Sequence, residues 1–532
     1  MMRKRMWILP LAAVVLLGSG LSGLSQAAKG VNKNDCFSCH AEVEKLYSGS
    51  THGKLACETC HSGLTDHLKD DAVKPVTSLE LSTCGKCHKD QYESFYRVNW
   101  GAQARQEKGD PTGRSPMQDK LLAPHGFTKE HNEPRSHAFM LVDQLVVDRF
   151  AAGRYQFKDM FGYTRPGKAW DVLTDTGKTY PKEVSAAAGN PVCLQCKTTD
   201  LTLTWKHMGD KDPKAKWDRT SDVHELIKDV QNPVGCIGCH DPHAAKPRIV
   251  RDALIEGVER DGARPYAADK GKGQVEIISF RDDFRKIGLV SKKNSSLLCG
   301  QCHVEYNCNA GFEPESNDKV TMADRRANHF PMKNVVDILA HYDKIKFRDF
   351  KHAVTGARLV KLQHPEMETY WGSVHDLAGV GCSDCHMPKE KNKAGKTFSN
   401  HQVVRPKYHV KESCLGCHPK SSVEEKLYQI QAVQNYTRGK MRDAEAAIGL
   451  LIDTYAKAKE KGVKEEILAQ ARLQHEIAHV QWEWWTSENS DGWHNPELAK
   501  TSLFDAIVAA KKGSDLLIAA MAPPVPVAPA AK

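Results

Sequence analysis

Eight Cys-x-x-Cys pairs recur along this 532-residue chain, and they constrain its fold more than any other feature. Seven pairs are followed directly by histidine and one, the fourth, by lysine. The histidine copies are Cys36/Cys39/His40, Cys57/Cys60/His61, Cys84/Cys87/His88, Cys236/Cys239/His240, Cys299/Cys302/His303, Cys382/Cys385/His386 and Cys414/Cys417/His418. The lysine copy is Cys193/Cys196/Lys197.

Each histidine copy is the attachment signature of a c-type haem. The two thiols form thioethers with the porphyrin, and the adjacent histidine reaches the iron from one side. Zinc sites and disulfides also use paired cysteines, but neither requires a histidine after every second cysteine. The sequence therefore predicts eight haem c groups, with the seven motif histidines and Lys197 as proximal ligands.

The first residues predict export. A basic segment at residues 3–5 precedes an apolar run from Trp7 to Leu17 and a small-residue site ending at Ala27 or Ala28, which is typical of a secretory signal peptide. An uncleaved anchor is the alternative, but the run is shorter than the ~17 to 25 residues that a spanning helix needs. We expect a periplasmic protein with no membrane span after signal cleavage.

Eight haems in about 500 mature residues leave roughly sixty residues per cofactor, so the haems must supply much of the core. We predict a mainly α multihaem cytochrome c with little β, in which helices and loops wrap the haems. Motif density separates three regions, and the two ends of the chain add a signal peptide and a tail. The five predicted regions are signal peptide 1–28, N-terminal triple-haem domain 29–110, catalytic five-haem domain 111–420, C-terminal long-helix region 421–521 and flexible tail 522–532.

The cysteine-free region after the last motif has helical periodicity. Ser422 and Glu425 resemble a capping box, and the pattern continues to about Lys461. A second helix is expected from about Val463 to Thr486 and a third after Pro496. Such helices are expected to pack on the body or on a second subunit.

The formal net charge of +9 does not indicate a nucleic-acid partner. It includes the basic signal residues, and about sixteen haem propionates would offset it. The lysines and arginines are spread along the chain without a basic block.

Lys197 stands where the other motifs have an imidazole. A lysine amine has a reference pKa of about 10.4 and binds iron only after losing its proton. The opposite side of such an iron could remain open to a substrate. The alternative is a degenerate motif in which Lys197 has no axial role.

With Lys197 in this position, the chain resembles the ammonia-forming cytochrome c nitrite reductases, whose active-site haem motif is Cys-x-x-Cys-Lys. Eight haems with the lysine copy fourth are similar to the octahaem branch. Three further segments match in the family's order, over a region from Arg135 to His494. They are Pro134-Arg135-Ser136-His137, which has Ser where the family has Gly, His303-Val-Glu305-Tyr306, and Lys361-Leu-Gln363-His364.

The resemblance implies that Arg135, Tyr306 and His364 line the open face of the Lys197 haem. It also implies a calcium ion held by the Glu305 carboxylate, the Gln363 amide oxygen and the backbone carbonyls of Tyr306 and Lys361. These ligands are hard oxygens, as calcium requires. A cationic arginine and a histidine suit an anion that is reduced with proton uptake.

Cys308 is the seventeenth cysteine, and no haem needs it. In an extended segment Tyr306 and Cys308 point to the same face. In the octahaem branch such a pair is joined by a thioether, which the resemblance implies here. The alternative is a free buried thiol.

Seven ordinary haems need distal ligands. The resemblance suggests His137, His375, His401 and His494, while proximity to the motifs makes His52, His67, His125, His131 and His243 candidates. The sequence does not assign pairs. His475 is expected to be a surface or helix residue.

The predicted function is the periplasmic six-electron reduction of nitrite to ammonium at the Lys197 haem, with hydroxylamine, nitric oxide and possibly sulfite as further substrates. The resemblance implies a trimer or hexamer, and an electron-donor cytochrome or quinol dehydrogenase is expected. Two alternatives stay open. One is an octahaem hydroxylamine oxidoreductase, which would be expected to have histidine in all eight motifs, and the other is a non-catalytic electron conduit.

Overall fold

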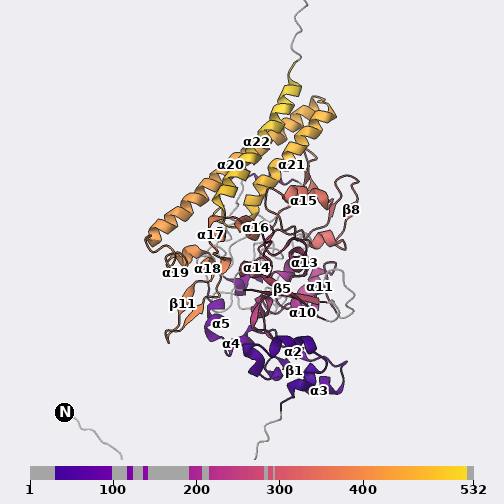
Figure 1. Ribbon diagram of the computed structural model, residues 1–532. Helices are drawn as coiled ribbons and strands as arrows, with labels where there is room; N and C mark the ends of the chain where they lie inside the picture. The colour runs from indigo at the N-terminus through magenta and orange to yellow at the C-terminus, as the bar shows by residue number, and fades with distance from the viewer. Residues whose placement is uncertain are drawn as a thin grey trace, which may run out of the picture. The chain divides into compact units, whose positions relative to one another are not determined.

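The computed structural model describes residues 30–98, 117–123, 136–141, 191–205, 215–280, 285–291 and 294–523 (Figure 1). Arg135, His125 and His131 lie outside these residues. The described residues fall into two compact units, one made of residues up to 41 together with 55–77, the other of residues 42–54 and all those from 78 onward.

Short helices separated by loops make up most of the structure before residue 420, as expected for a chain that winds around cofactors. Their bounds are α1 Lys33–Phe37, α2 Ala41–Tyr47, α3 Leu64–Lys69, α4 Leu81–Gly85, α5 Lys89–Phe95, α7 Gln118–Leu121, α9 Pro191–Gln195, α10 Leu201–Thr204, α11 Val223–Leu226, α12 Cys236–Cys239, α13 Asp252–Asp261, α14 Ser296–Cys299, α15 Ile338–Lys344, α16 Glu366–Tyr370, α17 Val374–Leu377, α18 Cys382–His386 and α19 Val410–Cys414.

The strands are few and short, which agrees with the predicted mainly α fold. The one four-stranded sheet has the order β3-β4-β6-β5, and all its pairs are antiparallel. The other described sheets have two strands. The bounds are β1 His61–Ser62, β2 Val76–Thr77, β3 His240–Asp241, β4 Lys246–Ile249, β5 Val275–Phe280, β6 Arg285–Val290, β7 Gly311–Phe312, β8 Lys319–Val320, β9 Phe350–Lys351, β10 Arg358–Leu359, β11 Lys389–Lys391 and β12 Thr397–Ser399.

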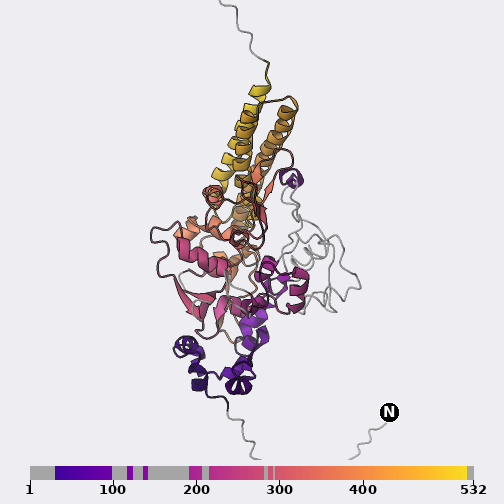
Figure 2. The same cartoon turned by 90° about the vertical axis from the view of Figure 1, so that its right-hand side faces the viewer.

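The C-terminal part is a bundle of three long helices, α20 Val423–Glu460, α21 Glu465–Ser487 and α22 Pro496–Met521, which lie side by side (Figures 1 and 2). The Ser422 hydroxyl accepts the Glu425 N–H at 3.1 Å, as the predicted cap requires. Gly462, with φ of 72°, follows the end of α20. The sequence therefore predicted these three helices to within a few residues.

A tryptophan-rich core joins the bundle to the rest of its unit. Trp482, Trp484 and Trp485 on α21 are fully buried, and each indole N–H has a partner. Trp482 donates to Glu445 on α20, Trp485 to Ser502 on α22, and Trp484 to Thr369 on α16. Because Trp484 turns away from the other two helices, α21 links the bundle to the segment that contains His364.

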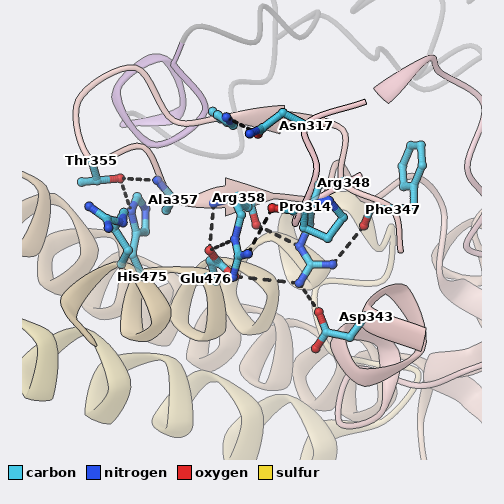
Figure 3. A network of polar contacts seen from close by, with 12 residues as sticks. Pro314, Asn317, Asp343, Phe347, Arg348, Thr355, Ala357, Arg358, His475 and Glu476 are labelled. Atoms are coloured by element: carbon cyan, nitrogen blue, oxygen red, sulfur yellow. Dashed lines mark hydrogen bonds and ion pairs between the residues drawn. The ribbon is translucent and has the colours of Figure 1, made fainter. Parts of the chain in front are cut away.

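A polar network also holds α21 against the β9–β10 hairpin (Figure 3). Glu476 of α21 accepts the backbone N–H and the guanidinium of Arg358. The buried Arg348 donates to Asp343 and to the Arg358 carbonyl, and lies 3.8 Å from Glu476. Thr355 Oγ1 hydrogen-bonds His475 Nδ1 at 2.9 Å. His475 is thus a helix residue, and it is fully buried.

Candidate active site

The first cysteine of every attachment motif lies in a short helical turn. Seven of these turns are α1, α4, α9, α12, α14, α18 and α19, and the eighth is the 3-10 turn Cys57–Thr59. A helical turn places residues three apart on one face, so both thiols of a motif point the same way. The next residue then continues around the turn, as in His303, whose N–H donates to the Cys299 carbonyl at 2.9 Å. This local geometry fits covalent attachment of a planar group through two thioethers and one axial side chain.

The attachment cysteines differ in their exposure. The structure leaves Cys39, Cys87 and Cys417 exposed and Cys60 only half-buried. All four are the second cysteine of a motif, and each lies beyond the last residue of the helical turn that contains the first cysteine. They belong to the first three motifs and the last one.

The turn geometry is nevertheless kept at these four positions. The N–H groups of Cys39, Cys60, Cys87 and Cys417 each donate to the carbonyl of the first cysteine of their motif at 3.2 Å. Both thiols of each motif therefore still lie on one side of the chain. Their role in haem attachment stays a prediction.

Six motif histidines each face one of the candidate distal histidines. The ring centres are 6.1 to 6.4 Å apart in His40–His67, His52–His88, His137–His303, His240–His401, His375–His418 and His386–His494. A metal-bound imidazole nitrogen lies about 2 Å from the metal and about 1.2 Å from its own ring centre, so two trans imidazoles have centres roughly 6.3 Å apart. The spacing fits one iron between each pair.

Several of these histidines have a backbone carbonyl beside Nδ1. His52 Nδ1 lies 2.7 Å from the Pro242 carbonyl and His67 Nδ1 2.7 Å from the Val73 carbonyl. A carbonyl acceptor fixes the hydrogen on Nδ1 and leaves Nε2 free to bind a metal. The remaining distal candidate within the described residues, His243, lies 4.0 Å from Asp241 through its Nδ1.

Burial favours the neutral form of two of the motif histidines, which is the form that binds a metal. Burial, and then the neighbouring His494, lowers the pKa of His386 to about 4. Burial, and then His401, lowers the pKa of His240 to about 4.

The lysine motif adjoins the His303 motif. Cys196 is buried, its thiol lies 3.9 Å from the Gln301 carbonyl, and the Cys302 thiol lies 3.9 Å from the Cys196 carbonyl. Lys197 itself is half-buried at the end of the turn that starts in α9. Two attachment sites therefore lie within contact distance although a hundred residues separate them in the chain.

Tyr306 and His364 converge beside the His303 motif. The ring centres of Tyr306 and His364 are 6.3 Å apart, and those of His303 and His364 are 6.5 Å apart. Tyr306 is 6% exposed, and its ring packs on Phe330. The structure brings together two of the three predicted substrate-facing residues, while Arg135 lies outside the described residues.

Cys308 is 4% exposed and belongs to the same apolar cluster as Tyr306. The two residues flank Asn307, which forms a β-bridge with His329, so the backbone is extended there as assumed. Burial of both side chains fits either a bonded pair or a free buried thiol.

The four proposed calcium ligands also lie together. Glu305 is fully buried, its Oε2 accepts the Gln363 N–H at 2.7 Å and its Oε1 accepts the Tyr342 hydroxyl at 3.2 Å. Lys361 and Gln363 are 3% and 7% exposed. Burial raises the pKa of Glu305 well above its usual range, and Glu483 raises it further. A dication beside Glu305 would reverse this penalty.

The described residues contain no group of three or more histidine, cysteine, aspartate or glutamate side chains arranged as a metal site. A calcium ion here would therefore need amide and carbonyl oxygens as well as Glu305. The donor set of Glu305, Gln363 and two backbone carbonyls meets that condition.

Several residues around this site were not predicted. Glu366 Oε2 lies 3.3 Å from His303 Nδ1, and Glu366 Oε1 accepts the Asn489 N–H at 3.1 Å. Both oxygens of Glu368 accept the Glu305 N–H. Glu366 could have been found because it lies two residues after His364, whereas Asn489 lies beyond the end of α21 and no sequence signal marked it.

One family model, described as cytochrome c552, matches residues 153–524, which is most of the chain. The chain belongs to the cytochrome c552 family. This is the family of the cytochrome c nitrite reductases, so the protein is a haem c oxidoreductase and nitrite reduction is its general chemistry.

Among solved structures, the cytochrome c552 fold is shared with the cytochrome c nitrite reductase of Desulfovibrio desulfuricans ATCC 27774, at 21% identity and a TM-score of 0.58. The match covers 83% of this chain and 86% of that one. The description of that enzyme refers to two calcium sites in its catalytic subunit. The outer cell wall cytochrome OcwA aligns with 17% identity over 86% of this chain and 70% of its own, but at a TM-score of only 0.36.

No helix among the described residues is long and apolar enough to cross a membrane.

Proposed function

We propose that this protein reduces nitrite to ammonium with six electrons at a haem attached through Cys193 and Cys196. The observation that carries the proposal is that Tyr306 and His364 converge beside the His303 motif, which contacts the one attachment motif that ends in lysine through Cys196 and Cys302. When bound there, the haem supplies an iron that takes nitrite and passes electrons to it. Lys197 would hold that iron from one side and leave the other side to the substrate.

The chain's own side chains would supply charge and protons. Arg135 would hold the nitrite anion, and His364 would donate protons to the oxygens that leave as water. His364 is half-buried, with its Nδ1 3.5 Å from the Asn489 side-chain amide, so its ring has a fixed orientation. Tyr306 would deliver a proton or an electron from the opposite side of the same space.

The six facing histidine pairs support bis-histidine ligation of six further haems. Contacts between neighbouring attachment motifs support an order of electron transfer among their haems. The helix with Cys299 packs on the helix with Cys382, and Cys196 lies against the Gln301–Cys302 segment. Electrons would therefore pass from the His386 haem through the His303 haem to the Lys197 haem.

Calcium would bind at Glu305, Gln363 and the carbonyls of Tyr306 and Lys361, which come from the two segments that also carry Tyr306 and His364. The ion would thus fix the spacing of those two side chains. A thioether between Tyr306 and Cys308 would fix the phenol further. Trypsin fragments containing both residues should then have a mass two hydrogens below that of the unmodified peptide.

The predicted signal peptide supports a periplasmic location, and hydroxylamine, nitric oxide and possibly sulfite are proposed as further substrates. An electron-donor cytochrome or a quinol dehydrogenase would reduce the protein. The protein would assemble as a trimer or hexamer.

The test is an ammonium assay with nitrite and a chemically reduced dye, comparing wild type with Lys197→His. We expect the variant to form at least tenfold less ammonium, because an imidazole replaces the amine on the catalytic iron. Lys228→His is the matched control, since Lys228 is an exposed lysine paired with Glu225. It should retain full activity.

Electron paramagnetic resonance separates the proposal from a pure electron conduit. The resting wild type should show a high-spin ferric signal that changes when nitrite is added. If all irons are low-spin and nitrite has no effect, or if nitrite disappears without ammonium, the proposed function is wrong.

A further inference from the structure

Arg251, at the start of helix α13, is a buried arginine whose side chain has no hydrogen-bond acceptor in the described part of the chain. It is 5% exposed, and none of its three guanidinium nitrogens has a partner among the described residues. A guanidinium stays charged in proteins, and a buried charge is costly unless an opposite charge or hydrogen bonds compensate it. The side chain therefore requires an acceptor that these residues do not supply.

An aromatic ring covers the guanidinium without taking its hydrogen bonds. The Arg251 guanidinium lies over the Phe330 ring, 5.2 Å from the ring centre, and Phe330 in turn packs on Tyr306. The ring attracts the cation but does not offer the oxygen acceptors that the N–H groups need. These N–H groups form a planar fork, which matches the two oxygens of a carboxylate.

Gln301, in the sixth attachment motif, fixes the backbone beside Arg251. Its side-chain oxygen accepts the Val250 N–H at 2.7 Å, and its side-chain nitrogen donates at 2.9 Å to the Gly238 carbonyl of the fifth motif. The Gln301 carbonyl lies 3.9 Å from the Cys196 thiol of the lysine motif. Arg251 thus lies where three attachment motifs meet.

The cavity that Arg251 lines also borders two cysteines of these motifs, Cys239 and Cys302. The charged residues that line it are Arg248, Arg251, Asp252, Arg285 and Lys286. Arg248 and Lys286 each donate to a carboxylate at 2.7 Å, and Arg285 donates to backbone carbonyls. The Asp252 carboxylate accepts the N–H of the next residue and does not hydrogen-bond Arg251. Among these cations, Arg251 is the one without an acceptor in the described residues.

We propose that Arg251 binds a propionate carboxylate of one of the haems attached around this cavity and keeps it ionised. The inference rests on the haem attachment of the proposed function. Haem c has two propionates, and a two-point pair with one of them would satisfy the buried guanidinium. Free nitrite is also a planar anion with two oxygens, so the experiment separates these two sources.

The test is a reduced-minus-oxidised infrared difference spectrum of the intact holoprotein in nitrite-free buffer, compared between wild type and Arg251→Met. Beside Arg251 the propionate stays ionised in both oxidation states, because the cation lowers its pKa. Without that cation, burial raises the pKa of the propionate, so it takes up a proton when its iron gains an electron. The variant should show an additional band of a protonated carboxyl group, and carbon-13 in the haem carboxyl groups should shift that band.

Three outcomes would overturn the inference. Absence of the additional band would show that Arg251 holds no carboxylate. A band that ignores the haem label would belong to a protein carboxyl group such as Asp252. A difference between the two proteins that requires added nitrite would mean that Arg251 holds free nitrite instead of a haem propionate.

Two further substitutions at the same position separate charge from side-chain packing. Arg251→Lys keeps the charge and should resemble wild type. Arg251→Gln removes it and should show the additional band, which keeps the test decisive if the methionine variant takes up fewer haems. Arg325→Met is the matched control, since Arg325 is exposed and lies 3.1 Å from Glu256, and it should show no additional band.

The spectrum needs no turnover, so the inference and the proposed function can fail separately. A wild-type spectrum in an Arg251→Met variant that still forms ammonium would refute the role of Arg251 alone. A wild type that contains its haems but forms no ammonium would refute the proposed function alone.

Discussion

Among single residues, Glu483 on α21 has the most consequential contacts outside the haem motifs. It is fully buried, with Lys361 Nζ 2.5 Å from one oxygen and His479 Nε2 2.8 Å from the other. Lys361 begins the Lys-x-Gln-His segment, so this ion pair ties the predicted calcium loop to the bundle. Glu483→Gln should destabilise the holoprotein by about 3 to 5 kcal/mol, because it leaves a buried ammonium beside a neutral amide.

Calorimetric melting of the holoprotein measures this effect. The control is Glu497→Gln, whose carboxylate lies 4.0 Å from Lys500 with both side chains largely exposed. That variant should change stability by no more than about 0.5 kcal/mol. Equal melting temperatures for Glu483→Gln and wild type would show that the buried pair adds nothing.

The same carboxylate predicts an acid-dependent loss of stability. Burial would raise the pKa of Glu483, but Lys361 and then His479 outweigh it and hold the pKa at about 2. An unfolded glutamate titrates at about 4.3, so the stabilisation is complete above that pH and is lost as the pH falls toward 2. Between pH 5 and 2 the melting temperature of wild type should fall more steeply than that of Glu483→Gln. Parallel curves would contradict the assignment.

At the scale of elements, α20 offers the clearest test of a local sequence signal. The Ser422 hydroxyl accepts the Glu425 N–H, and Ser422→Ala should cost about 1 kcal/mol at the start of the helix. Hydrogen exchange in the first turn reports the loss. Ser421→Ala is the neighbouring control, since the Ser421 hydroxyl has no hydrogen bond in the described part of the chain. Equal exchange in the two variants would show that the cap is irrelevant.

Helices and motifs were predictable because their signals are local. The capping residue Ser422, the periodicity of α20 and the Cys-x-x-Cys spacing each lie within a few residues of the chain. The placement of α21 was not predictable, since His475, His479 and Glu483 are spaced like any polar face of a helix. Their burial arises from partners more than a hundred residues away, such as Thr355 and Lys361. For the same reason, distal histidines could be proposed from the sequence but not paired.

The exposure of individual motif cysteines was not predictable either. Cys87 and Cys196 occupy the same position in identical spacings, yet the first is exposed and the second is buried. The difference arises from distant segments, because Cys196 lies against the Gln301–Cys302 segment of another motif. A motif specifies its own turn but not what packs over it.

For the whole molecule, the central prediction is the cofactor count. The intact mature protein should have the mass of the chain after signal removal plus eight haem groups, measured by mass spectrometry under denaturing conditions. The double variant Cys193→Ser/Cys196→Ser should lose one haem mass and retain seven, because each motif binds its haem separately. Eight haem masses in that variant would show that the lysine motif does not attach one.

The docking of α21 also fixes the order in which the protein can mature. All eight attachment motifs precede α20 in the chain, whereas Glu483, Trp484 and Asn489 come near its end. Attachment at a motif needs only its own local turn, so every proposed haem can be attached before the bundle has docked. The loop with Lys361 and His364 can be locked only afterwards, which means that a half-made copy can contain all its haems and still lack a finished catalytic site.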